Sequence, residues 1–536
     1  MRRFRIRVVL ILACLLPFLR LGIGEVQAWD ESLYTIRADA CLTFGAWLDQ
    51  TPYAVGHLYS ATHPPFGVWL IALSKSLLGD STFAVRLPGA IAACFTIVLL
   101  FAFVKRLASE QAAILGAVSL SCADLFLLYS HRAQMESFIL CFAIASIYAL
   151  WSAIIYGRWY SVLFSAVFLG LGLLTKFAVV LFALPIFLLL PWMLGKPRAI
   201  VTSFQIILIA LVIAAPWFLF MMHAHPDYWQ HVGESFNTLT TGTYKPSRLS
   251  WWYYINRLMV GLPLIALTLA ILANRSLVRN KAIIVSIVWL IAVIVILQLV
   301  GTRMPHFATL LLLPGALLVG LIWNERVAMP RLHRIAAYAV LLFFIAWSAS
   351  EQIRLLLTGR LSWQAFIVAP GGILVALIIL TIGVFVFQNA DRLHRSTIVF
   401  AFLLLAIAYC HIFSEQQAVY NNGASQVAKI IKQMPAKTKL VVIHPNYPHE
   451  VYAPQLAYYT HGWTLGWDPS KTSKTVMVDT ATRINPDGQR DIVVIVRNVD
   501  RFNVSQPPSS ELTILDSTLR KSLQDRQEYR SYILYY

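Results

Sequence analysis

Three segments near the N-terminus decide the fold of this chain: WDESLY at residues 29–34, ATHPPFGVWL at 61–70 and AVRLPG at 84–89. They lie in the longest early stretch that is neither a continuous apolar run nor a tight turn. Two adjacent carboxylates, Asp30 and Glu31, follow an apolar run, and Arg86 stands where the chain becomes apolar again. A charge at the edge of a membrane needs a partner such as a phosphate or a carboxylate. The stretch therefore predicts a polar site at a membrane surface.

The composition is that of a polytopic membrane protein. Hydrophobic residues make up 58% of the 536 residues and charged residues 13%, and the mean hydropathy is +0.68, outside the range of soluble chains. The net charge of +18 could indicate nucleic-acid binding, but Lys and Arg fall in short clusters between apolar runs. Such clusters are typical of cytoplasmic loops and of contact with anionic lipid. No nucleic-acid partner is expected.

The cysteines argue against disulfides and against a zinc knuckle. Five of the six lie in predicted spans, no C-x-x-C motif occurs, and the tail after residue 410 has none. No cofactor is expected.

The charge pattern predicts thirteen spans, with the N-terminus in the cytoplasm and the C-terminus outside. An uncleaved first span at about 8–24 follows a basic start. The others are expected at about 83–104, 111–129, 137–156, 159–174, 177–194, 200–222, 254–272, 282–300, 307–323, 335–350, 364–388 and 396–413. Every loop assigned to the cytoplasm carries a Lys or Arg cluster, which supports this count.

Two outer loops and an outer tail complete the predicted organisation. The first loop, 25–82, is expected to hold helices lying along the membrane near 31–48 and 65–78, and the second covers 223–253. The tail, 414–536, has the pattern of a small soluble α/β unit, with a helix at 424–434 and strands at 439–443, 491–496 and 532–536. It carries no catalytic motif, which favours a structural or partner-binding role.

Charged and polar side chains gather at the outer ends of the predicted spans. They are Asp30, Glu31, His63, Arg86, His131, Arg132, Glu136, Lys176, Arg303 and His306. Carboxylates beside several cations at an outer membrane surface suit a substrate that carries a phosphate on a lipid anchor.

Four motifs, in order, carry a resemblance to a known family. They are Asp30-Glu31-x-x-Tyr34, His63-Pro-Pro65, Arg86-Leu-Pro88 and Gly172-Leu-Leu-Thr-Lys176. The order resembles the polyprenyl-phosphate-dependent glycosyltransferases of the GT-C fold, and within them the protein O-mannosyltransferases and the lipid A aminoarabinose transferase. Two positions depart from the family pattern. His63 stands where Lys is frequent, so a phosphate contact there would depend on protonation, and Glu136 stands where Asp is frequent.

The resemblance implies a GT-C domain over residues 1–413 that transfers a sugar from polyprenyl (undecaprenyl) phosphate at the outer face of the cytoplasmic (inner) membrane. The acceptor would be a hydroxyl or phosphate of a lipid, a glycan or a protein, and the reaction would be inverting and metal-independent. Asp30 would be the general base, with Glu31 and Glu136 as further catalytic carboxylates. Substrate binding would fall to Tyr34, His63, Arg86, Arg132, Lys176, Arg303 and His306.

Other interpretations of these residues stay open. Asp30 could cap a helix, Glu31 and Glu136 could pair with Arg, and Lys176 could extend to the interface. His223, His225 and Asp227, with His231, are weak metal candidates in a loop that also fits a polar interface. The competing function is a transporter or flippase for a lipid-linked saccharide, which would place charges at mid-span. A non-catalytic scaffold is the third possibility.

Overall fold

The computed structural model describes residues 2–27, 30–54, 58–176, 178–241, 253–262, 280–299, 304–325, 423–433, 440–443, 492–496, 526–528 and 532–535, with scattered positions at 265, between 401 and 412 and at 455–459. Its contacts divide the chain into two compact units. The first comprises Met1–Gly22 and Thr62–Glu415, and the second comprises Ile23–Ala61 and Gln416–Tyr536. The sequence-based division at residue 413 differs from this one, because the first part of the outer loop groups with the C-terminal region.

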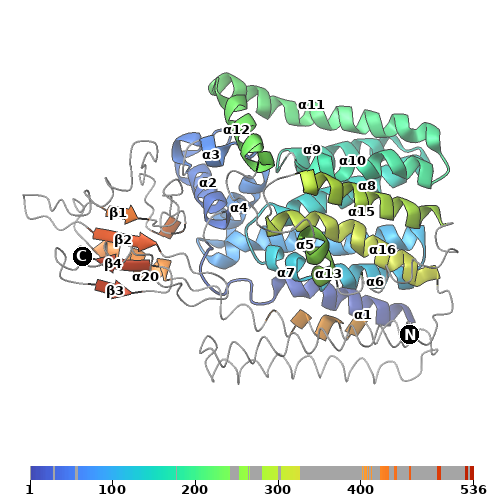
Figure 1. Cartoon of the computed structure of the whole chain (residues 1–536), viewed down its shortest axis with the longest axis horizontal. Helices are drawn as coiled ribbons and strands as arrows, with labels where there is room; N and C mark the ends of the chain where they lie inside the picture. Colours follow the sequence, from blue (N-terminus) through green and yellow to red (C-terminus); the bar gives the residue numbers. More distant parts are fainter. Residues whose placement is uncertain are drawn as a thin grey trace, which may run out of the picture. The chain divides into compact units, whose positions relative to one another are not determined.

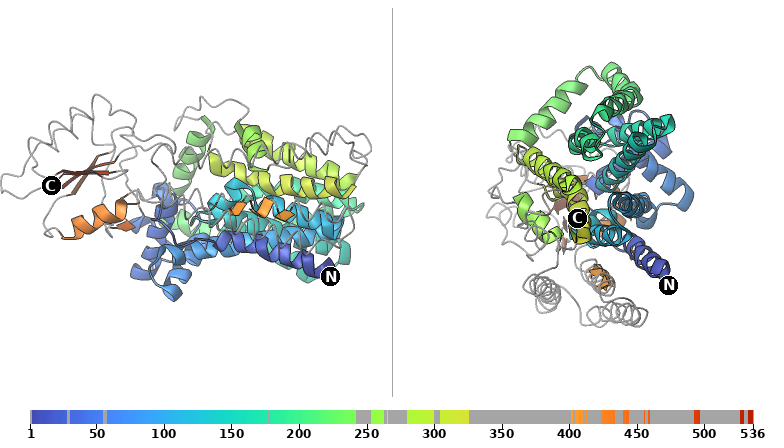
Figure 2. Two further views of the ribbon diagram at one scale, coloured as in Figure 1. Left: turned by 90° about the horizontal axis from the view of Figure 1, so that it is seen from below. Right: turned by 90° about the vertical axis from the view of Figure 1, so that its right-hand side faces the viewer.

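The first unit is a bundle of long apolar helices that run side by side (Figure 1), and the right-hand view of Figure 2 looks along them. Its helices are α1 (Arg2–Leu15), α4 (Phe66–Leu78), α5 (Thr82–Leu107), α6 (Glu110–Ser121), α7 (Asp124–Ser130), α8 (Glu136–Tyr156), α9 (Trp159–Leu173), α10 (Ala178–Met193), α11 (Ile200–Ala224), α12 (Tyr228–Thr241), α13 (Tyr253–Gly261), α15 (Lys281–Leu299), the 3-10 helix η5 (Pro305–Leu311) and α16 (Leu312–Glu325). The helix predicted near 65–78 is confirmed as α4.

Five helices in the described part of the chain are long and apolar enough to cross a membrane, or six if the bent pair α6 and α7 counts as one span. These helices correspond to the predicted spans at about 83–104, 111–129, 137–156, 200–222, 282–300 and 307–323. Two further predicted spans are the shorter helices α9 and α10, of 15 and 16 residues. The predicted spans at 335–350 and 364–388, about half of 254–272 and most of 396–413 lie outside the described residues.

Two of the predicted spans differ in detail from the structure. The helix at 111–129 is broken, because α6 and α7 meet at 65°. The Asp124 side chain there accepts a hydrogen bond from the Leu125 N–H at 2.6 Å, a local bond that competes with helix continuation. The first helix ends at Leu15, well before the predicted residue 24. A 3-10 turn containing Pro17 follows, and Pro cannot supply the N–H that would continue the helix.

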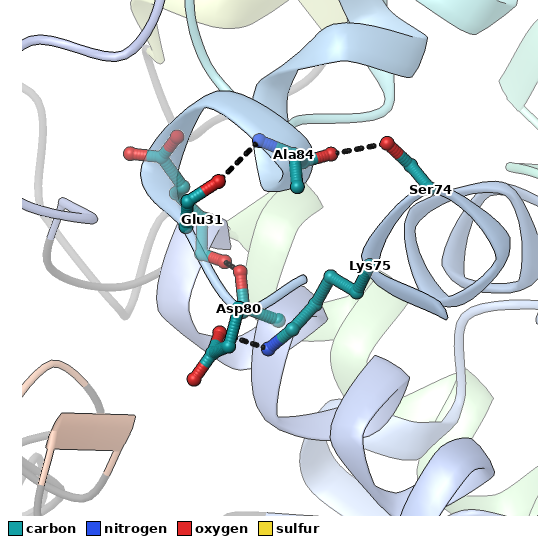
Figure 3. Close-up of polar contacts among 7 residues, drawn as sticks. Glu31, Ser74, Lys75, Asp80 and Ala84 are labelled. Atoms are coloured by element: carbon teal, nitrogen blue, oxygen red, sulfur yellow. Dashed lines mark hydrogen bonds and ion pairs between the residues drawn. The ribbon is translucent and has the colours of Figure 1, made fainter. Parts of the chain in front are cut away.

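A proline inside α5 explains how α4 and α5 are joined. Pro88 has no N–H, so it cannot donate to the carbonyl of Ala84 four residues earlier. The hydroxyl of Ser74, on α4, donates to that carbonyl at 2.6 Å (Figure 3). Nearby, the buried ammonium of Lys75 pairs with Asp80 at 2.8 Å across the turn between the two helices. The hydroxyl and the ion pair together fix the hairpin that carries the HPP and RLP motifs.

The same compensation occurs between α10 and α11. Pro191 leaves the carbonyl of Phe187 without its usual helical donor. The hydroxyl of Ser203, on α11, donates to this carbonyl at 2.7 Å, and Ser203 is fully buried. Without water, an unpaired carbonyl costs several kcal/mol, so the serine removes the main penalty of a proline in a membrane helix.

Small residues allow close approach elsewhere in the bundle. Ser146 of α8 and Ser165 of α9 each donate to the other's carbonyl, at 2.7 and 2.8 Å. A Cβ at Gly320 of α16 would lie 2.6 Å from the carbonyl oxygen of Ala112 on α6, so only glycine fits there. Serine and glycine at helix contacts are typical of membrane bundles, where van der Waals packing and interhelical hydrogen bonds hold helices together.

The second unit combines α2 (Asp30–Phe44), the 3-10 turn η2 (Thr51–Tyr53) and α3 (Leu58–Ala61) with α20 (Ala424–Gln433) and a four-stranded sheet. The strand order is β1 (Leu440–Ile443), β2 (Ile492–Val496), β4 (Tyr532–Tyr535) and β3 (Arg526–Glu528). β1 and β2 are parallel, and the other pairs are antiparallel. The strands β1, β2 and β4, the helix α20 and the helix expected near 31–48 coincide with predicted elements.

Candidate functional site

A buried ion pair marks one end of the helix bundle. Lys176 follows α9 and donates from Nζ to Oε1 of Glu136, the first residue of α8, at 3.1 Å. The side chains are 14% and 4% exposed, so both charges are largely removed from water. A turn in which the Lys176 N–H bonds the carbonyl of Gly172 at 2.9 Å holds the lysine in place. Both residues are candidates from the sequence, but the motifs do not predict that they pair.

Aromatic rings from η5 and α7 complete this cluster. The Lys176 ammonium lies 5.9 Å from the centre of the Phe307 ring, a cation–π distance. The neighbouring His306 packs edge-on against Tyr129, with ring centres 6.4 Å apart, and interacts electrostatically with Glu136. His306 was expected from the sequence, whereas Phe307 and Tyr129 were missed because aromatic residues are common in every apolar helix.

The HPP motif packs against the loop that carries Lys176. The N–H of Phe66, which opens α4, donates to the carbonyl of Leu174 at 2.9 Å. A Cβ at Gly67 would collide with the sulfur of Met135 and would lie 3.3 Å from Cγ2 of Thr175. Only glycine allows α4 to approach both the residue before Glu136 and the residue before Lys176.

His63 lies at the turn before α4 and is half-buried. Its predecessor Thr62 accepts a hydrogen bond from the hydroxyl of Tyr228 at 3.0 Å, and Tyr228, in α12, is fully buried. Tyr228 therefore helps to hold the HPP turn.

Arg86 and His131 bind the segment that follows α1. Arg86 is 2% exposed, and its Nη1 donates to the carbonyl of Leu21 at 3.3 Å. His131 is also buried, with Nδ1 at 2.7 Å from the Leu127 carbonyl and Nε2 at 2.9 Å from the Leu19 carbonyl. These contacts give Arg86 and His131 a role in fixing the chain between α1 and α2.

Arg132, the residue after His131, is half-buried. A Cβ at Gly89 of α5 would lie 3.2 Å from the Arg132 carbonyl oxygen. The loop from Ser130 to Glu136 thus runs across the beginnings of α5 and α4 before it enters α8.

The carboxylates of the first motif lie in the second unit. Asp30 is the first residue of α2 and is half-buried. Glu31 is fully buried, and its Oε2 accepts a hydrogen bond from the Gln27 N–H at 2.7 Å. Tyr34, one turn further along α2, is 4% exposed. The bond to Gln27 ties Glu31 to the segment that precedes α2.

The structure does not place the remaining candidate residues in a binding site. Arg303 lies outside the described residues. His223 and His225 stand at the end of α11, and Asp227 precedes α12. Within the described ranges, no group of three or more His, Cys, Asp or Glu side chains could hold a metal ion.

Solved structures of known proteins share this architecture. The crystal structure of ArnT from Cupriavidus metallidurans bound to undecaprenyl phosphate matches 98% of this chain and 97% of that chain, with a TM-score of 0.69 and 16% identity. The apo state of the same enzyme gives a TM-score of 0.66. The oligosaccharyltransferase of Archaeoglobus fulgidus gives 0.50 at 13% identity, over 91% of this chain and 68% of that one. The chain therefore has the GT-C fold of membrane glycosyltransferases.

Sequence comparisons narrow this class. Residues 62–220 match the family model for dolichyl-phosphate-mannose-protein mannosyltransferase, a region that includes His63, Arg86, Glu136 and Lys176. An undecaprenyl phosphate-alpha-4-amino-4-deoxy-L-arabinose arabinosyl transferase of Pseudomonas aeruginosa is 28% identical over 308 residues, 54% of each chain. One from Pseudomonas fluorescens is 26% identical over 359 residues, 63% of each. The match to the Pseudomonas aeruginosa protein spans about half of its length. These matches confirm the resemblance expected from the four motifs.

Proposed function

We propose that this protein is an integral membrane glycosyltransferase that moves a sugar from a polyprenyl phosphate to an acceptor on the outer face of the cytoplasmic membrane. The GT-C fold, shared with an ArnT captured with undecaprenyl phosphate, supports this function. The similarity to aminoarabinose transferases favours undecaprenyl phosphate as the carrier and a lipid as the acceptor.

The observation that carries the proposal is the buried lysine held at one end of the bundle. An ammonium has three N–H donors, so Lys176 can contact Glu136 and a phosphate oxygen at the same time. A low-dielectric surrounding strengthens that contact. Glu136 then acts by holding Lys176 in place, because a buried carboxylate already paired with an ammonium is a poor base.

The proposed reaction is a displacement at the anomeric carbon. The acceptor hydroxyl attacks while Asp30 takes its proton, the bond to the phosphate oxygen breaks, and the configuration inverts. The departing polyprenyl phosphate gains negative charge, which Lys176, Arg86 and Arg303 would stabilise. A contribution from His63 would weaken as pH rises, because a neutral imidazole carries no charge for the phosphate.

The proposed membrane arrangement keeps thirteen spans, the N-terminus in the cytoplasm and an outer α/β unit at the C-terminus. The parallel pair β1 and β2, in a sheet whose strand β4 contacts α20, supports the α/β assignment. The last turn of α5 carries Lys105 and Arg106, which suits the cytoplasmic side of the membrane. In this arrangement Lys176 and Glu136 lie at the opposite side.

Transfer in a defined membrane tests the proposal. Purified protein in nanodiscs would receive undecaprenyl phosphate carrying a radiolabelled sugar, aminoarabinose first, with lipid A, glycolipid and peptide acceptors. We expect transfer by the wild type, a fall in kcat of about 10²–10⁴ for Asp30→Asn with donor binding retained, and weakened donor binding for Lys176→Gln. The matched control is Lys105→Gln, whose ammonium is half exposed and pairs with Glu110.

The competing transport function gives a different result in the same system. The labelled lipid could move between the leaflets of sealed vesicles without transfer of sugar to any acceptor. This result would show that the protein is a flippase and would refute the transferase proposal. Full transfer by Asp30→Asn would remove Asp30 as the base.

A further inference from the structure

Glu25 holds the start of a helix that lies 398 residues further along the chain. Its carboxylate accepts hydrogen bonds from the N–H of Gly423 at 3.1 Å, the N–H of Ser425 at 2.9 Å and the Ser425 hydroxyl at 2.6 Å. Glu25 is only 7% exposed. The first N–H groups of a helix lack partners within it, and that end is electrically positive. A buried carboxylate here binds the beginning of α20 through charge-assisted hydrogen bonds.

The next residue is clamped by the same C-terminal region. The N–H of Val26 donates to the Tyr459 hydroxyl at 2.7 Å, and its carbonyl accepts from Nε2 of Gln455, also at 2.7 Å. Gln455 is 1% exposed, so this contact is inside the second unit. The backbone at residues 25 and 26 is therefore fixed on both sides.

A continuous series of hydrogen bonds leads from this clamp to the first turn of α2. The side-chain amide of Gln27 donates to the Glu25 carbonyl at 2.7 Å, and the Gln27 N–H donates to the Glu31 carboxylate at 2.7 Å. The Glu31 carbonyl accepts from the Thr35 hydroxyl at 2.6 Å, one turn further on. This turn begins at Asp30, so the start of α20 is connected to the residue proposed as the base.

We propose that Glu25 is a positioning residue and that the C-terminal region, through α20, sets the orientation of Asp30. The inference rests on the proposed function, in which Asp30 takes the acceptor proton. The proposal assigns a role in positioning Asp30 to the C-terminal region, whose sequence carries no catalytic motif. It also explains why residues 23–61 group with the C-terminal residues.

The test is Glu25→Gln, which keeps the size of the side chain but removes its charge and turns one acceptor oxygen into a donor. We expect kcat to fall about tenfold or more, with the KM for the undecaprenyl-phosphate sugar within about twofold of wild type, because Gly423 and Ser425, which Glu25 binds, are not among the proposed donor-binding residues. Ser425→Ala should reduce kcat in the same direction but less. Glu25→Asp should recover part of the activity. The control is Glu110→Gln, at the Lys105 pair.

Amide hydrogen exchange gives a readout that does not depend on activity. In Glu25→Gln, exchange should accelerate about tenfold or more in α20 and in the first turn of α2 together, while α8 and α5 stay as in wild type. Accelerated exchange in α20 alone would overturn the proposal, as would wild-type kcat in Glu25→Gln. If Glu25→Gln does not fold, Ser425→Ala decides by the same two measurements. A wild type that transfers no sugar would refute the proposed function, while coupled exchange would still establish the connection between α20 and α2.

Discussion

The hydroxyl of Ser74 replaces the N–H that Pro88 lacks, donating at 2.6 Å to the carbonyl of Ala84. The bond joins α4, which opens with the HPP motif, to α5, which carries Arg86. A proline that would weaken an isolated helix thus becomes a point of attachment between two helices.

The stability lost on removing the Ser74 hydroxyl should depend on whether Pro88 is present. Ser74→Ala leaves a buried carbonyl unpaired and should lower the free energy of unfolding by about 1–3 kcal/mol. In a Pro88→Ala background the helical N–H returns, so the same substitution should have almost no effect. Detergent-titrated unfolding of the wild type, the two single variants and the double variant measures the coupling, and additive effects would contradict it. The control is Ser76→Ala, whose exposed hydroxyl bonds the Leu73 carbonyl in its own helix.

Removing one partner of the Lys176–Glu136 ion pair should destabilise the protein much more than replacing both partners. Glu136→Gln leaves a buried ammonium without its carboxylate and should reduce the free energy of unfolding by about 3–5 kcal/mol, whereas Lys176→Met with Glu136→Gln should recover much of it. Neither variant should bind the undecaprenyl-phosphate donor as wild type does. Thermal unfolding and donor binding measure the two effects. Glu110→Gln, in a pair whose side chains are 50% and 22% exposed, should change stability by about 0–1 kcal/mol.

Gly67 should not tolerate a methyl group. Gly67→Ala would push against the Met135 sulfur and Thr175, displacing the two loops that carry Glu136 and Lys176. We expect destabilisation of about 1–3 kcal/mol and a weaker affinity for the donor. The comparison is Gly233→Ala in α12, where a Cβ meets nothing within 4 Å. Equal stability and donor affinity for both variants would show that this close approach is unimportant.

The thiol of Cys41 should resist alkylation. Burial raises the pKa of this thiol in α2 to about 11, although Arg37 acts in the opposite direction. A raised pKa keeps the group neutral below that pH, and the thiolate is the reactive form. In a variant that retains only Cys41, maleimide labelling at pH 7.5 should be slow in the folded protein and complete after denaturation. Rapid labelling of the folded protein would contradict the buried position.

Helix positions and the polar end of the bundle could be predicted from the sequence, because both depend on local pattern. Apolar runs predicted α5, α8, α11 and α15 to within a few residues. The polar side chains expected to gather at one side of the bundle included Lys176, Glu136 and His306. The early end of α1 was missed because Pro17 was read as part of a long apolar run. Apolar composition cannot show where a helix stops inside a span.

Long-range pairings could not be predicted. Glu25 lies before the Asp30-Glu31-x-x-Tyr34 motif and belongs to no motif itself. Its partner Ser425 lies 400 residues away, in a region without a catalytic motif. The contact of Lys176 with Glu136 spans 40 residues and depends on how α8 and α9 pack. Sequence pattern shows which side chains carry charge, but packing decides which of them meet.

The two serine–proline compensations join helices that are neighbours in the chain, α4 with α5 and α10 with α11. A helix with an unpaired carbonyl is poorly suited to enter lipid alone. The helices with such a carbonyl, α5 and α10, are therefore best accommodated once the neighbouring helix supplies its serine hydroxyl. During synthesis, α10 and α11, which are both predicted spans, should therefore leave the translocon as a hairpin rather than one at a time.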